Sequence, residues 1–269
     1  MKYNESTKKA RTRQTRILNL TANPIKKKLR KEFDTTTEKA LSQYKKAGEI
    51  NNSLYTDHEK NVYNIAYDGL IRGQDLGARG LLNTFVLGGW IDKNQSKSVL
   101  LDFQLKIRQY AIDNADFLAR KVAEKTKDLI NKIIEKNAVL LETNSREKNS
   151  FIDDLIAGAM AEAKETNIWR SVISAFAWGH SSNQEGVSSS ASIVEQNYPL
   201  ELLKVWITMK DEKVRDTHQP MEGVAVPTKE PFMVPTDGGS EPMMYPGDMS
   251  ASIGNWINCR CVKRFKIDE

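Results

Sequence analysis

The residues with the clearest capacity for chemistry lie near the C-terminus of the sequence. Cys259 and Cys261 are its two cysteines, and His218 is its only histidine after residue 200. The residues over 259–267 alternate as in a β-strand, which places both thiols on one face with their Cα atoms roughly 6.5–7 Å apart. That separation is at the upper limit of disulfide geometry, so we do not expect the two cysteines to bridge each other. Two thiolates and one imidazole are ligands that suit a structural zinc ion.

The same three residues leave other interpretations open. A tetrahedral zinc site needs a fourth ligand, for which Asp211, Asp216 and water are the candidates. Without a metal, the cysteines would be small buried apolar residues and the histidine a hydrogen-bonding turn residue. A nucleophilic thiol paired with the histidine, or a metal-dependent hydrolase, is less favoured, because the sequence has no P-loop, GxGxxG or HExxH pattern. We therefore expect that the protein is not an enzyme.

The elements that must position these residues form a small α+β module. Seven of the eight prolines fall after residue 198, and residues 203–209 alternate between apolar and other side chains, which predicts a strand. The closing residues 259–267 predict a second strand. Between the two strands, the segments Asp237-Gly238-Gly239 and Tyr245-Pro246-Gly247-Asp248 are typical of loops.

The residues before this module are predicted to be mainly helical. Apolar residues over 96–142 repeat at helical spacing, and residues 150–178 form a second such segment. Glycines at 69, 73, 77 and 80 lie in a helical stretch, and they indicate either a closely packed second backbone or a break in the helix. The polar, serine-rich run over 181–190 predicts a linker or loop.

The expected fold class is a mainly α N-terminal body with long helices, plus a small α+β C-terminal module. We divide the chain into a basic N-terminal arm (1–34), a helical body (35–180), a linker or loop (181–200) and the C-terminal module (201–269). No apolar run approaches the ~20 residues of a membrane span, and the N-terminus has no apolar segment of a secretory signal. We therefore expect a protein of the reducing cytosol without a membrane partner.

The positive charge of the chain is concentrated at its N-terminus. Residues 1–31 contain eleven lysines and arginines and one acid, a formal charge of +10, whereas the whole chain carries +5 and the remaining residues therefore −5. Such a basic segment favours polyanions, so double-stranded DNA is a candidate partner. The candidate nucleic-acid-binding residues are Lys8, Lys9, Arg11, Arg13, Arg16, Lys26, Lys27, Lys28, Arg30 and Lys31.

Five short pieces of the C-terminal module occur in the order found in one known family. The stretch from Trp206 to His218 resembles W-x-x-x-x-D-x-x-(V/T)-R-x-x-H of the phage Mu F-like minor head (head morphogenesis) protein family. A glycine after the histidine, a phenylalanine after a proline, a P-G-D loop and a closing N-C-R-C follow over residues 221–261. The matching residues are Trp206, Asp211, Arg215, His218, Gly223, Pro246, Gly247, Asp248, Asn258, Cys259, Arg260 and Cys261.

The resemblance implies a non-enzymatic protein of head morphogenesis. It implies association with the portal protein, with capsid or scaffold proteins as further partners. It also implies a location in the virion, inside the capsid near the portal vertex, and in the host cytoplasm during assembly. The alternative is a DNA-binding factor that acts in packaging or ejection through the basic arm.

Overall fold

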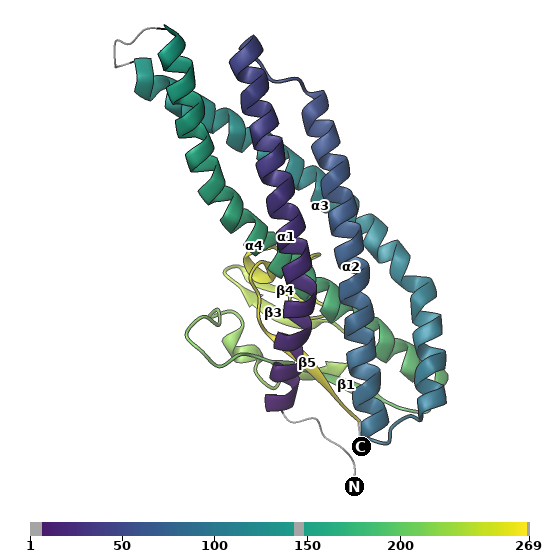
Figure 1. Ribbon diagram of the computed structural model, residues 1–269. Helices are drawn as coiled ribbons and strands as arrows, with labels where there is room; N and C mark the ends of the chain where they lie inside the picture. Colours follow the sequence, from purple (N-terminus) through teal and green to yellow (C-terminus); the bar gives the residue numbers. More distant parts are fainter. Residues whose placement is uncertain (1–6, 143–147, 268–269) are drawn as a thin grey trace. The chain divides into compact units, whose positions relative to one another are not determined.

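The computed structural model describes residues 7–142 and 148–267, and Figure 1 labels their helices and strands. Over these residues four long helices precede a module of short strands, which confirms the predicted fold class. The long helices are α1 (Thr7–Ala47), α2 (Ser53–Leu87), α3 (Lys93–Glu142) and α4 (Lys148–Asn197). The module contains β1 (Leu202–Ile207), β2 (Ala225–Pro227), β3 (Phe232–Thr236), β4 (Gly239–Met243), α5 (Ile253–Trp256) and β5 (Val262–Ile267).

The chain forms two compact units, and each long helix contributes to both. The sheet-bearing unit consists of residues 7–23, 69–111 and 176–267 of the described chain. The helical unit consists of residues 24–68, 112–142 and 148–175. The C-terminal module is therefore one part of a larger unit that also takes in segments of all four helices.

Helix α1 contains most of the basic N-terminal segment. The sequence predicts an arm over 1–34, but from Thr7 on these residues are the first part of a continuous helix. The basic residues obscure an apolar stripe whose members are mostly four, seven or eight residues apart, which is the pattern of an amphipathic helix. The buried apolar residues of this stripe are Ala10, Ile17, Ile25, Leu29, Phe33, Ala40 and Leu41.

The predictions for α3 and α4 had opposite outcomes. The long helix predicted over 96–142 is confirmed by α3. The linker predicted over 181–200 is wrong, because α4 continues to Asn197. Ser181, Ser182 and Ser190 are completely buried, so the small polar residues that predict a loop are an interior face of a helix.

That interior face of α4 packs against the glycines of α2 within the sheet-bearing unit. A Cβ on Gly73 would lie 1.9 Å from Ser182 Oγ, and one on Gly77 would lie 2.3 Å from the carbonyl oxygen of Asn183. From the other side, a Cβ on Gly186 would lie 2.1 Å from the carbonyl oxygen of Gln74. The glycines therefore serve close backbone packing, and α2 continues unbroken through them.

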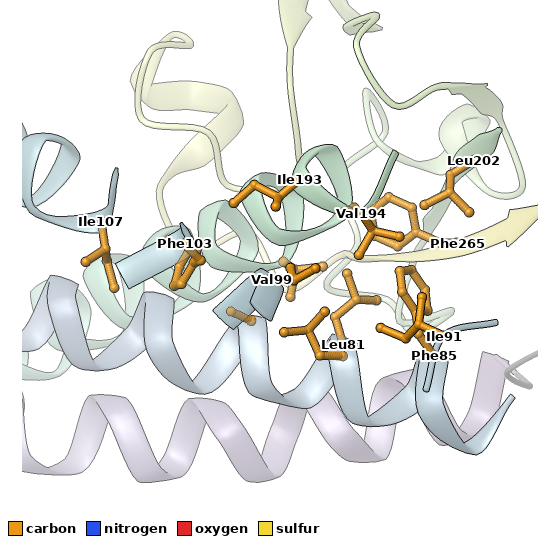
Figure 2. Close-up of a cluster of buried hydrophobic side chains, with 14 residues drawn as sticks. Leu81, Phe85, Ile91, Val99, Phe103, Ile107, Ile193, Val194, Leu202 and Phe265 are labelled. Carbon is orange, nitrogen blue, oxygen red and sulfur yellow. The ribbon is translucent and has the colours of Figure 1, made fainter. Parts of the chain in front are cut away.

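The main apolar core of the sheet-bearing unit joins helices to strands. Figure 2 shows Leu81 and Phe85 of α2, Val99 and Phe103 of α3, and Val194 of α4 pointing toward one another. Leu202 of β1 and Phe265 of β5 belong to the same cluster. Strands β1 and β5 are thus covered in part by the helices of the unit.

The described strands form two small antiparallel sheets. In the first, β1 lies between β2 and β5, with Lys204 opposite Phe265 and Trp206 opposite Lys263. Paired residues share a face, so these four side chains lie on the same side of the sheet. In the second sheet, β3 and β4 form a hairpin. A smaller core gathers Trp206, Met221, Phe232, Val234, Met243, Cys259 and Cys261.

The helical unit contains a buried polar network beside its own apolar core. His58 is 1 % exposed, and its Nδ1 lies 2.9 Å from Glu32 Oε1 and 3.0 Å from Thr36 Oγ1. Its Nε2 lies 3.1 Å from Thr126 Oγ1, which also accepts a 2.7 Å hydrogen bond from Arg170. These bonds join all four helices of the unit through polar atoms that would otherwise be buried without partners.

Candidate metal centre

His218, Cys259 and Cys261 come together in the sheet-bearing unit. Their side-chain ligand atoms all lie within 4.8 Å of one another, and His218 Nδ1 is 3.7 Å from each sulfur. Tetrahedral zinc with ordinary bond lengths places a nitrogen and a sulfur ligand about 3.6 Å apart. The three residues are 1–3 % exposed. The structure therefore contains a buried triad whose geometry suits a metal ion.

The backbone reaches this arrangement through turns rather than through a strand. The predicted strand over 259–267 begins only at Val262, so both cysteines lie in the segment that leads into β5. Asn258, which precedes them, has a φ of +55°, a left-handed conformation that asparagine adopts more easily than most residues. His218 ends a turn closed by the bond from its N–H to the carbonyl of Arg215, at 2.9 Å.

A chain of hydrogen bonds orients the imidazole of His218. Its Nε2 lies 3.2 Å from Asn255 Oδ1, and Asn255 Nδ2 in turn donates to Glu241 Oε1. Because Asn255 offers its oxygen, Nε2 is the donor and Nδ1 faces the two sulfurs. Histidine ligands of metal ions are commonly held by such a partner on the other ring nitrogen. The sequence gives no sign of this chain, because its members lie on separate elements.

The two thiols form one electrostatically coupled pair. The pKa of Cys261 is lowered to about 5, mainly because Cys259 donates to its sulfur; burial opposes this, and Trp206 and the His218 ring in its protonated form reinforce it. Burial raises the pKa of Cys259, and the neighbouring Cys261 raises it further. The indole N–H of Trp206 is buried without an acceptor of its own, so it is available to a thiolate. The pocket thus stabilises negative charge on sulfur.

Neither acid that the sequence nominates as a fourth ligand belongs to the group of ligand atoms formed by the triad. Asp211 accepts two hydrogen bonds from Arg260, at 2.8 and 2.5 Å, and Asp216 is exposed and accepts a bond from Gln219. Beside His218 and Cys261 lies a cavity of about 10 Å³. Such a space holds about one water molecule, so water is the remaining candidate.

Other residues of the family-like motif surround the triad. The indole of Trp206 stands edge-on to the His218 ring, with ring centroids 5.3 Å apart. Arg215 donates to the carbonyl of Ile257, next to the turn that carries the cysteines. Gly223 has a φ of +81°, and its N–H bonds the carbonyl of Trp206 at 2.9 Å. These pieces of the motif therefore belong to one network.

The P-G-D loop has a different contact, with His180 of α4. A Cβ on Gly247 would lie 2.5 Å from His180 Cδ2, and the φ of Gly247 is +82°, so this position requires glycine on two counts. Asp248 accepts bonds from the Met244 and Ser250 N–H groups, at 2.8 and 3.0 Å. Burial, and then the charge of Lys263, lower the pKa of His180 to about 4, while backbone groups of Cys261 and Pro246 oppose this shift.

Two buried lysines of the same unit are a further feature that the sequence pattern did not reveal. Lys204 and Lys263 are 0 and 1 % exposed, and they lie on the side of the sheet that packs against α4. Lys263 Nζ donates to the carbonyl of Gln184, at 2.6 Å, and also to Ser188. Lys204 Nζ donates to the carbonyl of Met244 at 2.9 Å. Strand alternation alone cannot distinguish such lysines from exposed ones.

The burial of Lys204 predicts a specific pH dependence of stability. Burial lowers its pKa from 10.5 to about 8, although Asp248, Glu185, Glu230 and Glu195 oppose the shift. The folded state therefore binds this proton less tightly than the unfolded state, and stability rises as the pH increases from 8 to above 10. A difference of this size corresponds to about 3 kcal/mol at most.

The variant Lys204→Met tests this contribution, together with the smaller effect that the charge of Lys204 has on the pKa of Lys263. We expect urea denaturation to show Lys204→Met gaining stability relative to the parent protein at pH 7, and losing most of that gain at pH 10. A difference between the two proteins that does not change with pH would contradict the assignment.

The candidate nucleic-acid residues do not form one free basic segment. Arg11 Nε donates to the carbonyl of Thr208 at 2.9 Å, and Arg13 donates to Thr84 Oγ1 at 3.1 Å. These two arginines therefore hold α1 within the sheet-bearing unit. Lys8, Arg16, Lys26, Lys27, Lys28, Arg30 and Lys31 have exposed side chains, and the side chain of Lys9 lies outside the described residues.

Within the described ranges, no helix has the length and apolar content needed to cross a bilayer. Comparison of the chain with protein-family models, with curated proteins and with solved structures found no match in any of the three.

Proposed function

We propose that the protein is a phage minor head protein that binds the portal protein during head morphogenesis, with a structural zinc ion in its C-terminal module. One observation carries the proposal: motif residues up to 55 positions apart in sequence, from Trp206 to Cys261, converge on one buried triad. This convergence supports the resemblance, because residues that share one network in the fold are the ones a family motif would retain.

Zinc is the metal that this donor set favours. Two thiolates neutralise its charge, and the imidazole supplies a borderline nitrogen ligand. Three protein ligands with room for one water also occur in catalytic zinc sites. Here, however, the cavity beside the ligands is about 10 Å³, whereas pockets for small molecules measure roughly 300–1,000 Å³. The site therefore supports a structural role, in which His218, Cys259 and Cys261 hold the metal.

The portal interaction is tested by mixing the purified protein with the portal protein of the same phage and running the mixture on a sizing column. We expect the two to co-elute at low and at moderate salt, because a specific interface depends less on salt than a polyanion contact does. Absence of co-elution at both salt concentrations would contradict the proposal.

A second arm of the experiment separates the DNA-binding alternative. Duplex DNA replaces the portal protein, and Lys8→Gln/Arg16→Gln is compared with the parent protein. If the parent protein binds DNA but not the portal protein, and this variant binds DNA more weakly, the result would favour a packaging or ejection factor.

A further inference from the structure

The helical unit carries a groove between α1 and α4 that has no part in the metal centre. The groove has a volume of about 520 Å³ and is open to solvent. Figure 1 shows the two helices that bound it. Its lining residues are basic on the α1 side and largely apolar on the α4 side. They include Lys26, Lys27, Arg30, Lys31, Ile168 and Val172.

The α1 wall of the groove is cationic and mostly uncompensated. Its four basic residues follow the spacing i, i+1, i+4, i+5, so they share one face of the helix. Arg30 forms an ion pair with Asp34 at 3.8 Å. Lys26, Lys27 and Lys31 are exposed and have no ion pair with any described residue. Two acids also line this wall, so its formal net charge is +2, which favours an anionic partner.

The α4 wall is an exposed apolar strip with the same spacing. Ile168 and Val172 line the groove, and Trp169 and Ile173 continue the strip beside it. Trp169 is 63 % exposed and the other three are 37–38 % exposed. Contiguous apolar surface of this kind, with an exposed tryptophan, is typical of protein-binding sites.

Buried hydrogen bonds hold the two walls of the groove together, so the groove exists before any partner binds. Asn167 is 1 % exposed, and its Nδ2 lies 3.2 Å from Asp34 Oδ1 and 3.3 Å from Thr37 Oγ1. These contacts tie α4 to α1 one residue before the apolar strip. A preformed site loses less conformational entropy on binding.

From these observations we infer that the groove binds an amphipathic helix of a partner protein, with acidic residues on one side and apolar residues on the other. Residues 26–38 of α1 extend for about 18 Å, which accommodates three to four turns of a helix. The acids of the bound helix would face Lys27 and Lys31, and its apolar residues would face Val172. A nucleic-acid duplex fits less well, because the phosphate backbone on its outside has no group to cover the apolar strip.

The position of two acids argues against an anionic membrane and gives the groove a direction. Asp34 and Glu38 lie at one end of the groove, and the lysines lie toward the other. A uniformly anionic lipid surface would meet both signs of charge. A helix whose acids are concentrated toward one end matches the gradient.

The test uses the full chain and two labelled peptides of about 15 residues, made of glutamate, leucine, alanine and glutamine. In one peptide the glutamates and leucines fall on adjacent helical faces; in the other the same residues are shuffled. Fluorescence anisotropy is expected to show the segregated peptide binding at least about tenfold more tightly. Equal binding of the two peptides would overturn the proposal.

Matched variants locate the binding. Lys27→Glu/Lys31→Glu and Trp169→Ala/Val172→Ala are each expected to weaken binding of the segregated peptide by about tenfold or more. Lys39→Glu/Lys46→Glu on α1 and Val139→Ala on α3, which is 64 % exposed, are the controls and should bind as the parent does. The lysine variants change only exposed side chains, so they keep the test valid if an α4 variant is unstable.

Two other outcomes would show that the groove binds a different partner. In the first, the protein binds a short DNA duplex and does not distinguish the two peptides. If the lysine variant weakens this DNA binding and the α4 variant does not, the groove is a polyanion site. A concentration-dependent shift on a sizing column that both variants abolish would identify a second copy of the chain. Neither result depends on the portal protein, so failure here is distinguishable from failure of the proposed function.

Discussion

Removal of zinc by a chelator is expected to lower the melting temperature of the full-length protein by more than about 10 °C. The reason is that His218, Cys259 and Cys261 are buried and hold together a turn, a loop and the start of β5. Binding of structural zinc contributes about 10–16 kcal/mol to the folding of small domains. Here we expect a smaller loss, because the apolar core that the strands share with the helices still stabilises the unit when the metal is removed. A loss of about 4 kcal/mol accounts for the expected shift in a chain of this size.

Three measurements check this expectation. Metal analysis should find one zinc per chain, and both thiols should react slowly with a thiol reagent before chelation and rapidly after it. His218→Ala and Cys261→Ser should lose the metal, whereas Asp216→Ala, in the same turn but exposed, should retain it. If the protein contains no metal and its melting temperature is the same before and after chelation, the prediction is wrong and the cysteines are small buried apolar residues.

Gly186→Ala is expected to destabilise the protein by about 3 kcal/mol or more, although it adds a single methyl group. The added Cβ would lie 2.1 Å from the backbone carbonyl of Gln74, so α2 and α4 would have to separate. Gly77→Ala should behave similarly, because its Cβ would meet the carbonyl of Asn183 at 2.3 Å. The free energy of unfolding in urea measures both effects.

Another glycine of α2 provides the matched control. A Cβ on Gly80 would lie 3.0 Å from Ile17 Cδ1, the end of a flexible side chain. Alanine is favoured over glycine in a helix by about 1 kcal/mol, so Gly80→Ala should be close to neutral. If Gly186→Ala were no more destabilising than Gly80→Ala, the two helices would not be in backbone contact.

The sequence predicts the helices where apolar spacing is regular and fails where small residues replace it. The stripe over 96–142 predicts α3 to within a few residues. The run over 181–190 contains few large apolar residues, yet it lies inside α4 because Ser182 and Asn183 face the glycines of α2. Loop composition and a close helix–helix contact share the same small residues, and only the partner helix distinguishes them.

The candidate site shows a similar division. Period-two alternation places Cys259 and Cys261 on one side, and the structure brings them together with His218. The alternation does not reveal that Asn258 turns the chain before them, nor that Asn255 and Glu241 orient the imidazole. These contributions depend on where separate elements meet in space, which a local pattern does not encode.

The composition of the sheet-bearing unit has a consequence for the order in which the chain folds. Arg11 of α1 bonds the carbonyl of Thr208, 197 residues later, and Phe265 of β5 packs with Phe85 of α2. Contacts of such long sequence separation form slowly, and during synthesis they must await the last strand. The first segment of α1 and the second half of α2 would leave the ribosome with their apolar faces uncovered, whereas the first half of α4 is enough to complete the helical unit. We therefore expect the helical unit to form first on the ribosome and the metal centre to be the last part to assemble.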